Sequence, residues 1–173
     1  TSGLVMSITA IGLENSENII KRYGAKPNDL LVVTGDLGGA YLGLQILERE
    51  HAVYLANPNM QPEMEGYDYI LEKQLKPEAR TDIKKTLEEL GVKPTSMIDV
   101  SDGLSSEILH LSDQSKVGFR LYEEKIPMDS LTISTADELN LNPAMCAMNG
   151  GEDFELLFTI APEDFEKIRK DRK

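Results

Sequence analysis

Cysteine, tryptophan and histidine are scarce in this chain of 173 residues, which has one Cys, no Trp and two His. The lone cysteine, Cys146, excludes an internal disulfide and fits a reducing, cytoplasmic setting. Neither His51 nor His110 stands at a metal-ligand spacing from the other or from Cys146, so a zinc site built from them is not expected. The sequence also lacks the G-x-S-x-G and H-E-x-x-H motifs of serine hydrolases and zinc proteases.

Long apolar runs are missing too. No stretch approaches the roughly 18 residues that a membrane helix needs, and residues 1–12 lack the basic and apolar regions of a signal peptide. The net charge of −12 argues against a nucleic-acid partner, because phosphate neutralisation requires clustered Lys and Arg. Surplus carboxylates remain compatible with a hard cation that holds a small anionic ligand.

Short apolar runs alternate with helical spacings along the chain. Strands are predicted at Leu4–Leu13, Leu30–Val33, Ser96–Val100, Val117–Tyr122 and Phe154–Ile160. Helices are predicted at Asn18–Tyr23, Tyr41–Arg49, Gly66–Leu75, Arg80–Leu90, 104–111, Leu131–Leu139 and Pro162–Lys173. Because strands and helices intermix, we expect an α+β fold in which helices cover a sheet.

The sharpest local motif is Asp99-Val100-Ser101-Asp102-Gly103-Leu104, at the junction of a predicted strand and helix. One interpretation is a simple helix cap, since Ser and Asp side chains accept hydrogen bonds from the free N–H groups of a helix start. The other is a metal site. Asp99 ends an apolar strand, where an uncompensated carboxylate is costly, and Asp102 lies close enough to converge on one point with it. Magnesium typically takes one or two carboxylates together with phosphate oxygens and water.

A second motif, Gly150-Gly151-Glu152-Asp153-Phe154-Glu155-Leu156, precedes a predicted buried strand. The two glycines permit a sharp turn and close approach of a ligand to the backbone. Taken alone, this motif is equally typical of an ordinary turn with solvated acids.

A third candidate region joins Arg22 to the glycine-containing turn Thr34–Gly39. Glycines between a strand and a helix can present N–H groups to phosphate, but this turn has neither of the named phosphate-loop patterns. A packing turn explains it at least as well. Arg22 carries the planar fork that suits phosphate oxygens, although a single arginine is more often a surface residue.

Taken together and in this order, the motifs resemble thiamine-monophosphate kinases, which belong to the aminoimidazole ribonucleotide synthetase-like superfamily. The resemblance implies an α+β domain with a mixed sheet covered by helices on both sides. It implies that residues 1–13 are the last strand of a truncated N-terminal nucleotide-binding domain. Residues 14–173 would be a C-terminal domain that ends before the family's final segment. A fragment of this extent is expected to be inactive alone.

The resemblance also implies a reaction and its ligands: magnesium-dependent, in-line transfer of a phosphoryl group from ATP to thiamine monophosphate, giving thiamine diphosphate. It places magnesium on Asp99 and Asp102, ATP on Arg22 and Ser101, and the thiamine substrate on Glu152, with no catalytic residue beyond the metal ligands. The full-length protein is expected to be a cytoplasmic homodimer formed through its N-terminal domain.

The chain departs from the family pattern in two places. The turn Asp36–Ala40 lacks the Gly-Asp-Ser often found there, and the connection His51–Tyr69 is longer than usual. The chemistry itself fits the composition. A phosphate monoester has a second pKa near 6, so the acceptor is already ionised at neutral pH and needs no histidine base. Two alternatives stay open: another ATP-using enzyme of the superfamily, such as a ribonucleotide or selenophosphate synthetase, or a non-catalytic module that binds divalent ions.

Overall fold

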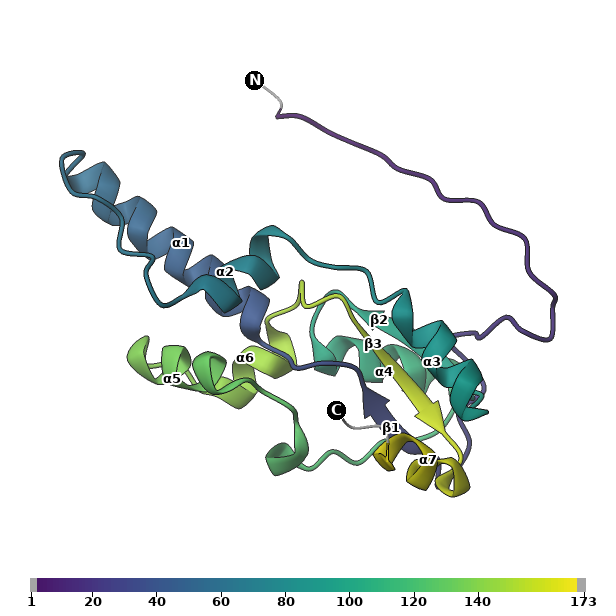
Figure 1. The fold of residues 1–173 in the computed structure, drawn as a ribbon. Coiled ribbons are helices and arrows are strands. Elements are labelled where there is room, and N and C mark those ends of the chain that lie inside the picture. The colour runs from purple at the N-terminus through teal and green to yellow at the C-terminus, as the bar shows by residue number, and fades with distance from the viewer. Residues whose placement is uncertain (1–2, 171–173) are drawn as a thin grey trace.

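A computed structural model describes residues 3–170 of the chain. Its sheet has three strands in the order β1 (Leu30–Val33), β3 (Glu155–Ile160) and β2 (Ser96–Val100), as Figure 1 shows. Both pairings are antiparallel, so the sheet is not mixed within residues 3–170. The α+β class predicted from the sequence is confirmed.

The helices lie between and after these strands. They are α1 (Gly39–Ala56), α2 (Asp68–Leu75), α3 (Asp82–Leu90), α4 (Leu104–Ser115), α5 (Ser130–Glu138), α6 (Pro143–Asn149) and α7 (Phe165–Lys170), with short 3₁₀ turns η1 (Glu123–Lys125) and η2 (Pro162–Asp164). Helices were correctly predicted at α1 to α5 and α7. The sequence prediction missed α6, although Asn142 and Pro143 are a typical helix start. The side chain of Asn142 indeed caps α6 by accepting from the N–H of Met145 at 3.0 Å.

Helices cover both faces of the sheet, because alternate residues of each strand point to opposite sides. On one face, Leu157 of β3 packs in a buried cluster with Leu111 of α4 and Ala147 of α6. On the other face, Phe158 packs with Leu87 of α3 and Ile168 of α7. The central strand, β3, therefore has both faces buried.

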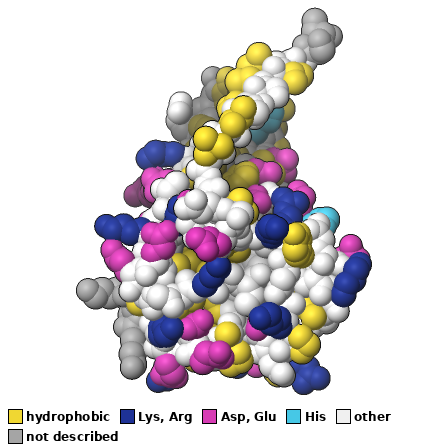
Figure 2. Space-filling view, turned by 90° about the vertical axis from the view of Figure 1, so that its right-hand side faces the viewer, with side chains coloured by type: hydrophobic (Ala, Val, Ile, Leu, Met, Phe, Trp, Pro, Cys, Tyr) yellow, Lys and Arg dark blue, Asp and Glu magenta, His cyan; other side chains and the backbone are white. Residues whose placement is uncertain are grey.

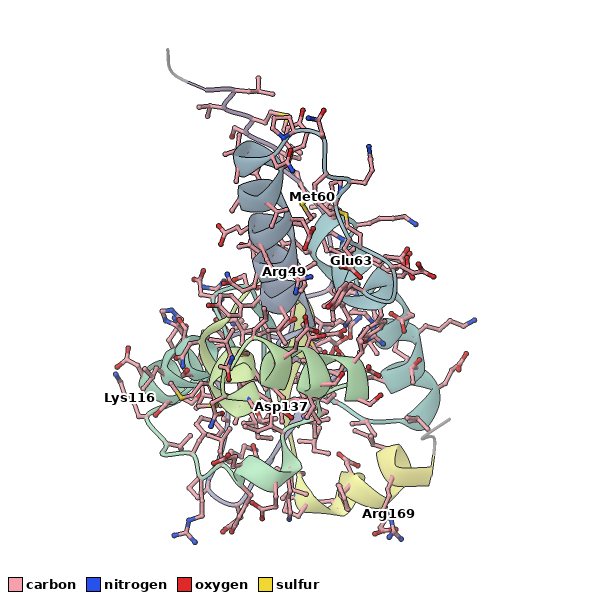
Figure 3. All side chains as sticks on the ribbon, turned by 90° about the vertical axis from the view of Figure 1, so that its left-hand side faces the viewer. Arg49, Met60, Glu63, Lys116, Asp137 and Arg169 are labelled. Atoms are coloured by element: carbon pink, nitrogen blue, oxygen red, sulfur yellow. The ribbon has the colours of Figure 1, made fainter. Side chains whose placement is uncertain are left out.

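Helices α1 and α2 form a hairpin that packs beside α5 through a separate apolar cluster. A buried carboxylate reinforces the hairpin: Glu50 accepts from Arg49 Nε at 2.8 Å and from the backbone N–H of Glu63 at 2.8 Å. Arg49 also reaches Glu138 of α5 at 2.7 Å. Figure 3 shows Arg49 on α1 and Glu63 on the loop that returns beside it. The connection His51–Tyr69 is long partly because α1 continues through its first residues.

The strand predicted at Leu4–Leu13 is wrong for this structure. Residues 3–13, which we call the arm, have no regular secondary structure and extend away from the body (Figure 1). Their large apolar side chains are at least 78% exposed, and Figure 2 shows them along the arm. A strand exists only where its backbone groups pair, and no described residue pairs with the arm.

Two other predicted elements are also wrong. Asn18–Tyr23 is not a helix; it runs beside β2, where the carbonyl of Lys21 accepts from the N–H of Met97 at 2.9 Å. Val117–Tyr122 is not a strand, although Phe119 and Leu121 pack against the core. Alternating apolar residues report one-sided burial, and burial does not require a hydrogen-bonded partner strand.

Residues 171–173 of the last predicted helix, and residues 1 and 2, lie outside the described residues. None of the helices in residues 3–170 combines the length and the hydrophobicity needed to cross a membrane.

Candidate functional site

The two acidic motifs, far apart in the sequence, meet at one end of the sheet. The backbone N–H of Glu152 donates to the carbonyl of Ser101 at 2.7 Å, and that of Phe154 donates to the carbonyl of Val100 at 2.8 Å. Gly151 makes this approach feasible: its φ is 71°, and a Cβ there would lie 2.6 Å from the Ser101 oxygen. The two motifs therefore adjoin each other in the fold.

The four predicted site residues of the two motifs have side chains with no protein partner within residues 3–170. Asp102 and Glu152 are exposed, while Asp99 and Ser101 are half-buried. Within residues 3–170, none of these four side chains takes part in a hydrogen bond or ion pair. Oxygen atoms in this state are available to a ligand at modest desolvation cost.

The helix-cap interpretation of the first motif is wrong. Helix α4 has Gly103 as its N-cap residue, and no side chain caps it. The side chains of Ser101 and Asp102 therefore do not serve the helix start. A different residue stabilises the turn: Glu107, buried at 2% exposure, accepts from the backbone N–H of Asp102 at 3.2 Å.

Arg22, the fifth predicted residue, lies on the segment that follows the outer edge of β2. The neighbouring Lys21 is bonded to Met97 of that strand, and the N–H groups of Gly24 and Ala25 donate to Ser115 Oγ at 3.2 Å each. The Arg22 side chain is exposed and has no ion pair with another residue of the described range. It stands beside the strand that carries Asp99, without direct contact between the two.

Asp153, the neighbour of Glu152 in the second motif, points into the interior. It is 5% exposed and accepts from the backbone N–H groups of Gly38 at 2.8 Å and Ala40 at 3.2 Å. Burial raises the pKa of its carboxyl to about 6, although the two N–H donors act in the opposite direction. Because these donors point at Asp153, the turn at Thr34–Gly39 is a packing contact.

Glu155 was missed. Its buried carboxylate accepts from Thr34 Oγ1 at 2.6 Å, from Lys73 Nζ at 2.9 Å and from Arg80 Nη1 at 2.6 Å. Glu155, Lys73 and Arg80, together with Asp153, line a cavity of about 380 Å³ beside α2. No sequence signal joined them, because the partners of Glu155 come from three distant segments.

Cys146 is buried, and burial raises the pKa of its thiol, as expected for an unreactive cysteine. His51 and His110 lie exposed on α1 and α4.

The donor set suits a hard cation that brings other ligands with it. Nowhere in residues 3–170 do three or more His, Cys, Asp or Glu side chains gather to hold a metal ion. Asp99 and Asp102 supply two carboxylates. Magnesium bound with nucleotide phosphates uses one or two carboxylates and fills its remaining positions with phosphate oxygens and water. The residues present therefore fit magnesium when it is bound together with a nucleotide.

No protein-family model matches the chain. In sequence, it is 32% identical over 168 residues to thiamine-monophosphate kinase of Bacillus subtilis (strain 168), covering 97% of this chain and 48% of that protein. It is 34% identical over 174 residues to thiamine-monophosphate kinase of Methanocaldococcus jannaschii, covering 98% and 50%. The chain thus spans about half the length of the curated relatives it matches.

Comparison with solved structures points to the same class of protein. AaThiL complexed with AMPPCP and TMP matches with a TM-score of 0.71 and 29% identity, over 86% of this chain and 44% of that one. The hydrogenase maturation protein HypE of E. coli matches with a TM-score of 0.63 and 15% identity, over 87% and 40%, which shows the fold alone. The chain has the aminoimidazole ribonucleotide synthetase-like fold. Within that class, its sequence is homologous to thiamine-monophosphate kinases over about half of their length.

Proposed function

We propose that this chain is part of an ATP-dependent thiamine-monophosphate kinase, which transfers the γ-phosphoryl group of ATP in line to thiamine monophosphate and releases thiamine diphosphate and ADP. The observation that carries the proposal is the meeting of the two acidic motifs, with unpartnered side chains, in a chain homologous to kinases of that name. Binding of AMPPCP and TMP by one matching structure supports the two substrates.

The proposed roles follow from charge. Asp99 and Asp102 would hold magnesium, which supplies positive charge to neutralise the phosphates when bound. Arg22 and Ser101 contact ATP; the guanidinium fork suits phosphate oxygens. Glu152 contacts thiamine monophosphate, because its carboxylate attracts a cationic thiazolium ring and accepts from an aminopyrimidine. The acceptor phosphate is already ionised at neutral pH, so no side chain must remove its proton.

The arm supports a proposal about domain organisation. Residues 3–13 expose a row of apolar side chains that nothing in the described chain covers. Exposed apolar rows of this kind mark an interface. We assign residues 1–13 to the last strand of a preceding nucleotide-binding domain and residues 14–173 to the C-terminal domain. The dimer interface of the longer protein lies in that preceding domain.

The experiment that tests the function is a turnover assay on the full-length protein with ATP, magnesium and thiamine monophosphate. We expect thiamine diphosphate and ADP in equal amounts, and no turnover by residues 1–173 alone. Aminoimidazole-pathway and selenide substrates serve as control acceptors. Turnover of one of these instead of thiamine monophosphate would overturn the proposal, as would binding of divalent ions without any turnover.

A further inference from the structure

The turn that carries Glu152 has a backbone conformation that ordinary residues avoid. Glu152 and Phe154 have φ values of 62° and 50°, in the left-handed region that favours glycine. Non-glycine residues persist there only where the surrounding structure holds them. Hydrogen bonds on two sides hold this turn.

One side of the turn is held by backbone groups. The N–H groups of Glu152 and Phe154 donate to the carbonyls of Ser101 and Val100 at 2.7 and 2.8 Å, which fastens the turn to the end of β2. Between these two residues, Asp153 points in the opposite direction, into the interior.

The other side is held by Asp153 itself. Its two carboxylate oxygens accept separate hydrogen bonds from Gly38 and Ala40, at the start of α1. Helix α1 has 18 residues and packs on α2, α5 and α6, so its position in the fold is well fixed. Among the side chains of the turn from Gly150 to Phe154, Asp153 is the one with hydrogen bonds to the rest of the described protein.

We infer that Asp153 is the positioning residue for Glu152. By fastening the turn to α1, it holds the Glu152 backbone in the left-handed conformation, against the Ser101 carbonyl at the end of β2. Asp153 is buried behind the turn, and its inferred role is carried through Glu152. This inference rests on the proposed function, since it takes Glu152 as the contact for thiamine monophosphate.

The chain offers a matched control on the same helix. Glu50 of α1 is also 5% exposed and also accepts two hydrogen bonds, from Arg49 and from the N–H of Glu63. Glu50 has no contact with the turn. Asp153→Asn and Glu50→Gln each remove one buried charge that touches α1, and only the first acts on the turn.

The kinetic test uses the full-length protein. Asp153→Ala risks misfolding, so Asp153→Asn, which keeps size and one acceptor, is the informative variant. We expect its KM for thiamine monophosphate to rise about fivefold or more while its KM for ATP stays within about twofold, the pattern of lost substrate binding. Glu50→Gln should leave both constants unchanged. An unchanged KM in Asp153→Asn, or equal changes in both variants, would overturn the inference.

A second measurement does not depend on turnover. Hydrogen exchange of the Glu152 and Phe154 amides reports whether the turn stays closed on β2. We expect faster exchange at both amides in Asp153→Asn and no change there in Glu50→Gln. If the wild-type protein does not phosphorylate thiamine monophosphate but this contrast is seen, the proposed function fails and the positioning role stands. Equal protection in all three proteins would overturn the positioning role.

Discussion

Asp102 is the residue at which the catalytic and the structural interpretations of the first motif diverge most clearly. Its side chain is exposed, caps no helix and has no partner within residues 3–170, whereas its backbone N–H is held by Glu107. A carboxylate left free in this way contributes little to folding. We propose that its role is to hold magnesium.

We therefore predict that Asp99→Asn and Asp102→Asn in the full-length protein lower kcat on the order of 10²-fold without lowering the unfolding temperature, because each removes electrostatic stabilisation of the transferring group. Steady-state kinetics at saturating substrates and a thermal melt check this. If Asp102 served only the helix start, Asn would replace it at no loss of rate, since Asn caps about as well as Asp.

Asp153 is predicted to make stability depend on pH. Its folded pKa of about 6 lies above the ordinary value of 3.8, so the native state holds this proton more tightly than the unfolded state. The stabilisation is present below pH 4 and is lost as the pH rises to 6, by up to about 3 kcal/mol. Urea unfolding at several pH values should show this loss in the wild type relative to Asp153→Asn. Parallel profiles for the two proteins would contradict it.

At the level of single residues, the sequence indicated the two acidic motifs but not the contacts of the buried acids behind them. Asp99, Ser101, Asp102 and Glu152 were predicted from two motifs, which backbone hydrogen bonds join in the fold. The roles of the four residues stay predictions. The contacts of the buried acids Asp153 and Glu155 could not be predicted. Their partners are backbone groups and cations from remote segments, which only the tertiary fold brings within reach.

Glu155 links elements that otherwise share few contacts. It ties the end of β1 through Thr34, helix α2 through Lys73, and the segment before α3 through Arg80. The Glu155 side chain is 6% exposed and its two cations are 19% and 25% exposed. The network therefore behaves more like a buried ion cluster than a surface one.

Replacing Glu155 with Gln should lower the free energy of unfolding by about 2–3 kcal/mol, because two partly buried cations lose their counter-charge. Glu138→Gln is the matched control. Glu138 also pairs with an arginine, Arg49, but is 47% exposed, and its loss should cost no more than about 1 kcal/mol. Denaturant titrations of both variants decide the matter; equal losses would show that the Glu155 network contributes no more than a surface pair.

Element prediction succeeded where the apolar pattern and the hydrogen bonding coincide. The strands of the sheet and the amphipathic helices satisfy both conditions. It failed for Val117–Tyr122 and for the arm, where apolar alternation is present but no backbone partner is. It also failed for Asn18–Tyr23, whose backbone is engaged by Met97 of β2 and so cannot turn into a helix.

At the scale of the whole molecule, the described chain brings its two acidic motifs to one end of its sheet and leaves an apolar arm uncovered at its start. Both features suit a domain that works against another. The fold itself does not specify chemistry, because the same architecture is found in HypE at 15% identity. Function must be tested at the site.

The most direct test is the steady-state kinetics of Glu152→Gln beside the wild type, in the full-length protein. The substitution keeps size and one acceptor but removes the charge that we propose to face the cationic thiazolium ring. The account predicts a higher KM for thiamine monophosphate and a nearly unchanged KM for ATP. If neither constant moves, Glu152 is a solvated turn residue. If only the ATP constant or the magnesium requirement rises, Glu152 serves the nucleotide, and the assignment of this surface to thiamine monophosphate is contradicted.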